Sequence, residues 1–401
     1  MINILIMGYY GLGNVGDEAI LAGIIASLEK NIEDVNIYVI TNSPIETKEL
    51  HNVHAVPQSF KKGSRIFFKK QIKEKEYKGI IKAINNCDVF ILGGGSLLQD
   101  FKVYYLPIFL SLVKLAQSKR KKTVIYGIGA GPIETTLGKY LCNKVLNNTD
   151  IVTVRNSSSK KALEKCGVNN VIQTVDPAFA LDLPDDDLII KVLSKQNINN
   201  TNGIISTTLH HKLYNDDLYR KTNGANIDIA KRRKIMAEIY DHLIQNYNQD
   251  VMFIPTEKND QKGYLEVRKI MNNKNTIVPD YSSNYKYVLS LLSVSNILIG
   301  MRLHSIILAT ILGVPFIALS YSSKVKSFLE LINLDDLYIE IEEIEKPYFK
   351  EKLTDLFANV WTNRTYYSKY LLEQSKKLRS IAFDNGKLVA DILNQGENTY
   401  G

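Results

Sequence analysis

An apolar strand, a glycine-rich turn and an apolar helix follow one another without interruption in INILIMGYYGLGNVGDEAILAGIIASL, residues 2–28. The four glycines of the turn allow the backbone to approach a ligand closely, and the helix that follows offers unpaired N–H groups and its positive dipole end. The turn lacks the G-x-G-x-x-G spacing of dinucleotide-binding proteins and has no P-loop lysine. We therefore expect an α/β ligand-binding domain that binds neither NAD nor ATP.

The rest of the chain repeats this alternation of apolar strands and helical segments, which is typical of βαβ units and of parallel sheets. A polar segment that begins DLPDDD at residue 182 separates two such series and suits a hinge. We predict an N-terminal Rossmann-like domain over residues 1–190, a C-terminal Rossmann-like domain over 200–345, and a helical segment over 346–401 that packs back on the first domain. The predicted strands are Ile2–Met7, Val35–Ile40, Asp88–Leu92, Thr123–Tyr126, Ile151–Val154, Val171–Val175, Gly203–Thr207, Asp250–Ile254, Ile297–Ile299 and Pro315–Leu319.

The composition is that of a water-soluble globular protein. The chain has 401 residues, of which 45% are hydrophobic and 23% charged, and a length that suggests two domains. Three cysteines, Cys87, Cys142 and Cys166, form neither an even set nor a C-x-x-C pair, so we expect free thiols, no disulfide framework and no metal site. The sequence opens on a strand without a basic leader, which predicts a cytoplasmic protein.

The formal net charge of +8 is concentrated in one segment, residues 61–78, where basic side chains alternate with isoleucine, phenylalanine and tyrosine. Two interpretations stay open for this segment: an amphipathic helix that binds an anionic membrane surface, or a solvated helix with one buried face. No helix-turn-helix, zinc-finger or RNA-binding motif accompanies the charge, so we expect no nucleic-acid partner.

Two further glycine loops, GGGSLLQD from Gly93 and GIGAGP from Gly127, each follow a predicted strand. Ligands of open α/β sheets bind beyond the carboxyl ends of the strands, so three such loops predict one ligand-binding face. For Asp17 two roles stay open: a helix-capping residue, or a carboxylate that orients or deprotonates a sugar hydroxyl. The residues of these loops that we expect to contact a substrate are Asn14, Gly94, Gly95, Ser96 and Gly129.

The segment GMRLHS, from Gly300, places Arg302 and His304 at a strand-to-helix junction, and Lys324 follows the next strand of the same βαβ unit. We expect this junction and Lys324 to lie at the same edge of a parallel sheet. A guanidinium, an ammonium and a helix N-terminus together predict an anion site, and His304 is placed to exchange a proton there. Arg155, which follows another strand of the first domain, is a further candidate cation.

Taken together, these motifs resemble those of the polysaccharide pyruvyl transferase family, and most closely its branch that pyruvylates secondary cell-wall polymers in Gram-positive bacteria. They run in order from residue 8 to residue 324 and include GYYGLGNVGDEA, GGGSLLQD, GIGAGP, VRNSSS, VDPA, GMRLHS and SYSSKV. The resemblance implies a GT-B-like fold, with two Rossmann-type, doubly wound domains that face a cleft. It also implies that the enzyme forms a pyruvate ketal from phosphoenolpyruvate on a saccharide acceptor, releases phosphate and needs no cofactor.

By the same resemblance, Arg302, Lys324 and Arg155 match donor-binding positions, His304 matches the acid/base, and Asp17 lies near the acceptor. The sequence departs from the family pattern after the strand Gly203–Thr207. Many members carry a V-R-P-like arginine there, whereas this chain reads TTLHHK, residues 207–212. Either one of His210, His211 and Lys212 replaces that cation, or donor binding is altered.

Two other functions stay open at this point. The first is a GT-B glycosyltransferase with a nucleotide-sugar donor, which the same architecture hosts. The second is a non-catalytic subunit of a polymer-assembly complex. For the pyruvyltransferase interpretation, a peripheral location at the inner face of the cell membrane, through the basic segment 61–78, stays open, as does the question whether the acceptor is lipid-linked.

Overall fold

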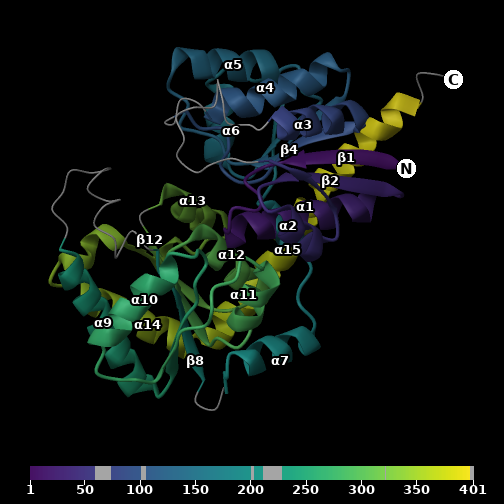
Figure 1. The fold of residues 1–401 in the computed structure, drawn as a ribbon. Coiled ribbons are helices and arrows are strands. Elements are labelled where there is room, and N and C mark those ends of the chain that lie inside the picture. Colours follow the sequence, from purple (N-terminus) through teal and green to yellow (C-terminus); the bar gives the residue numbers. More distant parts are fainter. Residues whose placement is uncertain (59–73, 101–104, 200–202, 211–227, 321, 398–401) are drawn as a thin grey trace. The chain divides into compact units, whose positions relative to one another are not determined.

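The computed structural model describes residues 1–58, 74–100, 105–199, 203–210, 228–320 and 322–397. The chain divides into two compact units (Figure 1). The first unit comprises Met1–Asp182 and Lys377–Gly401, and the second comprises Leu183–Lys376. None of the helices in the described ranges is both long and apolar enough to cross a membrane.

The first unit is built on a seven-stranded sheet in the order β3-β2-β1-β4-β5-β6-β7, with every neighbouring pair parallel. This is the order of a doubly wound sheet. The central strand β4 is buried from end to end, because helices cover both faces of the sheet. The strands are β1 Ile2–Met7, β2 Val35–Thr41, β3 His54–Pro57, β4 Val89–Gly93, β5 Lys122–Ile128, β6 Ile151–Val154 and β7 Val171–Gln173. The helices are α1 Val15–Asn31, α2 Pro44–His51, α3 Glu74–Asn86, α4 Tyr105–Ser118, α5 Thr136–Leu146, α6 Ser157–Glu164 and the 3₁₀ helix η1 Pro177–Ala180.

The second unit repeats this topology in a six-stranded parallel sheet with the order β10-β9-β8-β11-β12-β13. The strands are β8 Ile204–Thr208, β9 Asp250–Phe253, β10 Thr276–Ile277, β11 Ile297–Gly300, β12 Phe316–Ser320 and β13 Tyr338–Glu340. The helices are α7 Asp186–Lys195, α9 Ile229–Tyr247, α10 Asp260–Ile270, α11 Tyr285–Leu292, α12 Leu303–Leu312, α13 Ser323–Leu331, the 3₁₀ helices η3 Asp335–Leu337 and η4 Ile341–Glu345, α14 Phe349–Thr362 and α15 Arg364–Glu397.

The prediction of two doubly wound parallel sheets is confirmed, and each predicted strand is present within two residues of its expected ends. The structure adds β3, β10 and β13, which the sequence analysis missed. Each has two to four residues and lies at a sheet edge, so none carries an apolar run long enough to be recognised. Of the basic segment 61–78, residues 61–73 lie outside the described residues and the remainder begins α3.

The division between the units differs from the predicted ranges. The helix α7 packs on α11 and α14 packs on α9, so both belong to the second unit, as does α15 up to Lys376. From Lys377 onward α15 lies on the first unit. There Gly386 N donates to Ser27 Oγ over 3.1 Å, and Thr174 Oγ1 donates to Asn385 Oδ1 over 3.2 Å.

The contact between α15 and α1 needs a glycine. A Cβ at Gly386 would collide with the carbonyl oxygen of Ser27, whereas a Cβ at Gly79, which also lies in a helix, would meet no atom within 4 Å. We predict that Gly386→Ala lowers the stability of the first unit by about 1–3 kcal/mol despite the higher helix propensity of alanine. Thermal unfolding followed by circular dichroism measures this change.

Gly79→Ala is the matched control, because it makes the same substitution in a helix where there is space. Its expected effect is no loss of stability, or a gain of up to about 1 kcal/mol. A Gly386→Ala protein that melts at or above the wild-type temperature would contradict the proposed packing of α15 on α1.

Candidate functional site

In the first unit the glycine loops after β4 and β5 lie against each other at the carboxyl ends of these strands. Gly129 N donates to the carbonyl oxygen of Gly95 over 2.7 Å, and Leu98 forms a parallel bridge with Ala130. Gly94 and Gly95 both have φ near +67°, a conformation that favours glycine. The two loops therefore lie side by side at one edge of the sheet, and each contains predicted substrate-contacting residues.

Arg155, which follows β6, is buried beside these two loops. Its Nη1 pairs with Asp176 Oδ2 at 2.6 Å, and its Nη2 donates to Ser96 Oγ over 3.0 Å. A Cβ at Gly129 would lie 3.2 Å from Nη2, so glycine leaves room for the guanidinium. Only 4% of the side chain is exposed, and its Nε has no hydrogen-bond partner among the described residues. Arg155 therefore fixes Ser96, and Asp176 balances its charge.

The loop after β1 is held by two side chains of its own motif. Asn14 caps α1, since its Oδ1 accepts hydrogen bonds from Gly16 N at 2.9 Å and Asp17 N at 3.2 Å. Glu18 Oε1 accepts from Gly11 N at 2.8 Å, and Oε2 pairs with His51 at 2.9 Å, with both side chains buried. The capping role considered for Asp17 thus belongs to Asn14. Asp17 Oδ1 instead lies 3.4 Å from the position of a Cβ on Gly95, beside the β4 loop.

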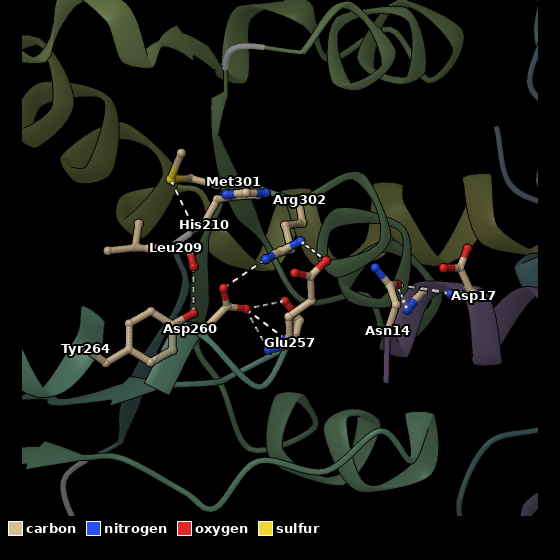
Figure 2. A network of polar contacts seen from close by, with 11 residues as sticks. Asn14, Asp17, Leu209, His210, Glu257, Asp260, Tyr264, Met301 and Arg302 are labelled. Carbon is tan, nitrogen blue, oxygen red and sulfur yellow. Dashed lines mark hydrogen bonds and ion pairs between the residues drawn. The ribbon is translucent and has the colours of Figure 1, made fainter. Parts of the chain in front are cut away.

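In the second unit Arg302 stands at the N-cap position of α12, directly after β11. Figure 2 shows the carboxylates of Glu257 and Asp260 converging on its guanidinium. Nη1 pairs with Glu257 Oε1 and Nη2 with Asp260 Oδ1, each at 2.8 Å. Burial disfavours the charge, but Asp260 and Glu257 outweigh burial and raise the pKa of Arg302 above its ordinary value. We call these three residues the Arg302 cluster.

The two acids were not found by the sequence analysis. Asp260 is fully buried, and its Oδ2 accepts from Thr256 N at 3.2 Å, from Thr256 Oγ1 at 3.1 Å and from Glu257 N at 2.8 Å. The segment PTEKND, which carries both acids, follows β9 as the glycine loops follow their strands. Its position after a strand was the available signal, but the absence of glycine made it resemble an ordinary polar loop.

The other predicted residues of the second unit lie at the same edge of the sheet. His304 is in the first turn of α12, and Lys324 is in the first turn of α13, after the neighbouring strand β12. Ser305 Oγ donates to Arg302 O over 2.7 Å and accepts from Thr208 Oγ1 at 2.7 Å, which ties β8 to this junction. The catalytic and binding roles of these side chains stay predictions.

His210 follows β8 beside this junction, where its backbone N–H lies 3.4 Å from Met301 Sδ. Tyr264 supports the same segment, because its hydroxyl lies 2.9 Å from the carbonyl oxygen of Leu209 (Figure 2). Burial, followed by the negative charge of Asp260, raises the pKa of Tyr264 well above its ordinary value, so the hydroxyl stays a donor. His211 and Lys212 lie outside the described residues.

Comparison with known sequences identifies a family. The family model of polysaccharide pyruvyl transferase matches residues 14–323. The amylovoran biosynthesis protein AmsJ of Erwinia amylovora is 22% identical over 427 aligned residues, which cover 97% of this chain and 99% of AmsJ.

Comparison with solved structures identifies the fold. The UDP-GlcNAc 2-epimerase of Neisseria meningitidis superimposes with a TM-score of 0.60 at 13% identity, covering 98% of this chain and 100% of that protein. The structure of S. aureus MnaA gives a TM-score of 0.58 at 11% identity, and the match covers 93% of this chain and 91% of that one. A glycosyltransferase of Rickettsia africae gives a TM-score of 0.56 at 12% identity, and the match covers 99% of this chain and 97% of that one. These similarities confirm the predicted GT-B-like fold class and concern the fold alone.

The Arg302 cluster generates a stability prediction. Arg302→Ala leaves the fully buried carboxylate of Asp260 without its guanidinium partner, which costs about 3–5 kcal/mol for a buried ion pair. We expect a clear fall in the apparent melting temperature. Lys262→Ala, which removes an exposed cation from α10, is the matched control and should change the free energy of unfolding by no more than about 0.5 kcal/mol.

A double variant separates the lost charge balance from lost packing. Adding Asp260→Asn to Arg302→Ala removes the unpaired charge, so the double variant should melt above Arg302→Ala alone. If Arg302→Ala melts like the wild type, the ion pairs do not stabilise this unit as described.

Proposed function

The chain belongs to the polysaccharide pyruvyl transferase family and is a transferase, and from this premise we propose that its donor is phosphoenolpyruvate. The proposed acceptor is a saccharide precursor of a cell-wall polymer or exopolysaccharide, and the products are a pyruvate ketal and phosphate. One observation carries the proposal: Arg302, His304 and Lys324 follow the adjacent parallel strands β11 and β12. Two cationic side chains and a candidate general acid therefore follow strands that end at one sheet edge, which supports an anion-binding site there.

The proposed reaction begins with proton transfer from His304 to the methylene carbon of phosphoenolpyruvate. This step converts the methylene group to a methyl group and leaves C2 with oxocarbenium character. A sugar hydroxyl then adds to C2 and releases its proton. Cleavage of the C2–O bond expels phosphate, and a second hydroxyl of the same sugar closes the ketal and releases the second proton. Histidine suits the proton transfers because its ordinary pKa lies near neutrality.

The side chains of the second unit would stabilise the negative charge of the donor. Lys324 supplies a point charge, and α12 and α13 point their N-termini toward the carboxyl edge of the sheet. In the first unit we assign acceptor contacts to Asp17 and Ser96. The carboxylate of Asp17 is proposed to accept a hydroxyl proton, and Ser96 is held in place by Arg155.

We also propose that the acceptor is lipid-linked and that the enzyme works in the cytoplasm at the inner face of the membrane. The basic segment 61–78 in the sequence supports this proposal, since clustered Lys and Arg bind anionic lipid surfaces. Phosphate release in the presence of lipid-linked disaccharides, compared with the water-soluble disaccharides alone, tests the acceptor class.

The donor is tested by ligand-induced stabilisation. We predict that phosphoenolpyruvate raises the apparent melting temperature of the purified chain, because a ligand that binds the native state stabilises it by mass action. UDP and UDP-GlcNAc are the comparison ligands and should leave it unchanged. Stabilisation by UDP-GlcNAc but not by phosphoenolpyruvate would replace the proposal by nucleotide-sugar transfer.

The role of His304 is tested by substitution. We expect His304→Ala to lower the rate of phosphate release by roughly 10²–10⁴-fold with the melting temperature retained, since a general acid contributes about this much. His242→Ala is the matched control, because among the described residues the ring of His242 contacts Asn246 of its own helix, over 3.2 Å. Near-wild-type turnover by His304→Ala would remove His304 from the mechanism.

A further inference from the structure

The Arg302 cluster has one positive group and two acidic groups. With Glu257 and Asp260 as carboxylates, the three side chains carry a formal charge of −1. The carboxylates engage both terminal nitrogens of the guanidinium, each over 2.8 Å. An anionic donor would meet an arginine whose charge is already balanced. A donor oxygen that approaches Nη1 or Nη2 therefore competes with one of the two carboxylates.

The two acids are held very differently. Asp260 has no exposed side-chain surface, and its second oxygen accepts hydrogen bonds from the backbone and hydroxyl of Thr256 and from the backbone of Glu257. This acid is built into the N-terminal turn of α10. The side chain of Glu257 is 18% exposed and reaches Nη1 from the loop before that helix. Of the two, Glu257 is thus the acid that has access to solvent.

Exchange at Nη1 conserves the interactions of the guanidinium. Removal of one partner from a buried ion pair is costly because it leaves an uncompensated charge. If an incoming carboxylate or phosphate oxygen takes the place of Glu257, Arg302 keeps a charge-assisted hydrogen bond at each terminal nitrogen. The displaced Glu257 side chain gains hydration. An uncharged ligand offers no such replacement, so the exchange selects for anions.

We propose that Glu257 is an exchangeable counter-ion of Arg302 that the anionic donor displaces, and that it thereby sets the affinity and the anion selectivity of the donor site. This inference rests on the proposed function for the identity of the donor. It assigns Glu257 a positioning role, holding Arg302 in its place between substrate molecules, and no part in the proton transfers.

The test is the binding of two probes, phosphoenolpyruvate and inorganic phosphate, to Glu257→Gln by isothermal titration calorimetry. Glutamine keeps the length and a carbonyl oxygen for Nη1 but lacks the competing charge. We expect the Kd of both probes to fall by about tenfold, and the KM for phosphoenolpyruvate to fall with kcat nearly unchanged, because the carboxylate that competes for Nη1 is removed. Glu257→Asp has a shorter side chain that also carries a carboxylate. Its Kd for both probes should lie between the values of wild type and Glu257→Gln, and it is the test variant if the glutamine variant does not fold.

Glu266→Gln is the matched control. Glu266 lies in α10, the helix that follows the loop of Glu257, and pairs with Lys269 at 2.8 Å instead of with Arg302, so its substitution changes the net charge equally. Equal gains in affinity in the two glutamine variants would show a long-range charge effect and overturn the inference. Unchanged or weaker binding of both probes by Glu257→Gln would also overturn it, as would a large loss of kcat at constant KM.

Failure of the proposed function has a different signature. If phosphoenolpyruvate binds neither the wild type nor Glu257→Gln, the donor assignment is wrong. Tighter binding of inorganic phosphate by Glu257→Gln than by wild type and Glu266→Gln would then still establish Glu257 as the counter-ion. If phosphate binding is also unchanged, both the donor assignment and the counter-ion role are rejected.

Discussion

Parallel strand pairing is the constraint on which the arrangement of the candidate residues depends. In each sheet the strand order reverses at one place, between β1 and β4 in the first unit and between β8 and β11 in the second. At such a place neighbouring strands lead into helices on opposite faces, and their loops separate at the carboxyl edge. Asp17 and Ser96 follow the first pair of strands, and His210 and Arg302 follow the second. Residues far apart in sequence thus come to one edge because of the topology, without any need for contact between them.

The two parallel sheets could be predicted from the sequence because the patterns that mark their strands and loops are local. Buried parallel strands are short apolar runs, and glycines mark the loops after β1, β4 and β5, so both the sheets and their ligand edges follow from patterns of fewer than ten residues. The edge strands β3, β10 and β13 have no such pattern. Their pairing is imposed by the neighbouring strand, which is tertiary information.

The partners of the arginines could not be predicted for a related reason. Arg155 and Asp176 are 21 positions apart, and Arg302 and Glu257 are 45 apart, and neither pair has periodicity or spacing that marks it. The sequence analysis identified the cations correctly as strand-end residues but treated their charges as available. A buried guanidinium requires a counter-ion, because the cost of removing an unpaired charge from water is comparable to the stability of a domain. Burial, which only the fold reveals, therefore decides how much charge an arginine offers to a ligand.

This charge balance changes the physical account of an anion site in the second unit. Arg155 with Asp176 sums to zero, and the Arg302 cluster sums to −1 with both acids ionised. An attractive potential for an anionic donor would then come from other groups. The helices α12 and α13 follow adjacent strands and contact each other, and each N-terminus contributes the equivalent of about half a positive charge. Lys324 is a further cationic side chain in the first turn of α13. Under the proposed function, the helix N-termini and Lys324 would attract the donor, and Arg302 would bind and orient it once Glu257 is displaced, so two parts of the same sheet edge would share the binding of the donor.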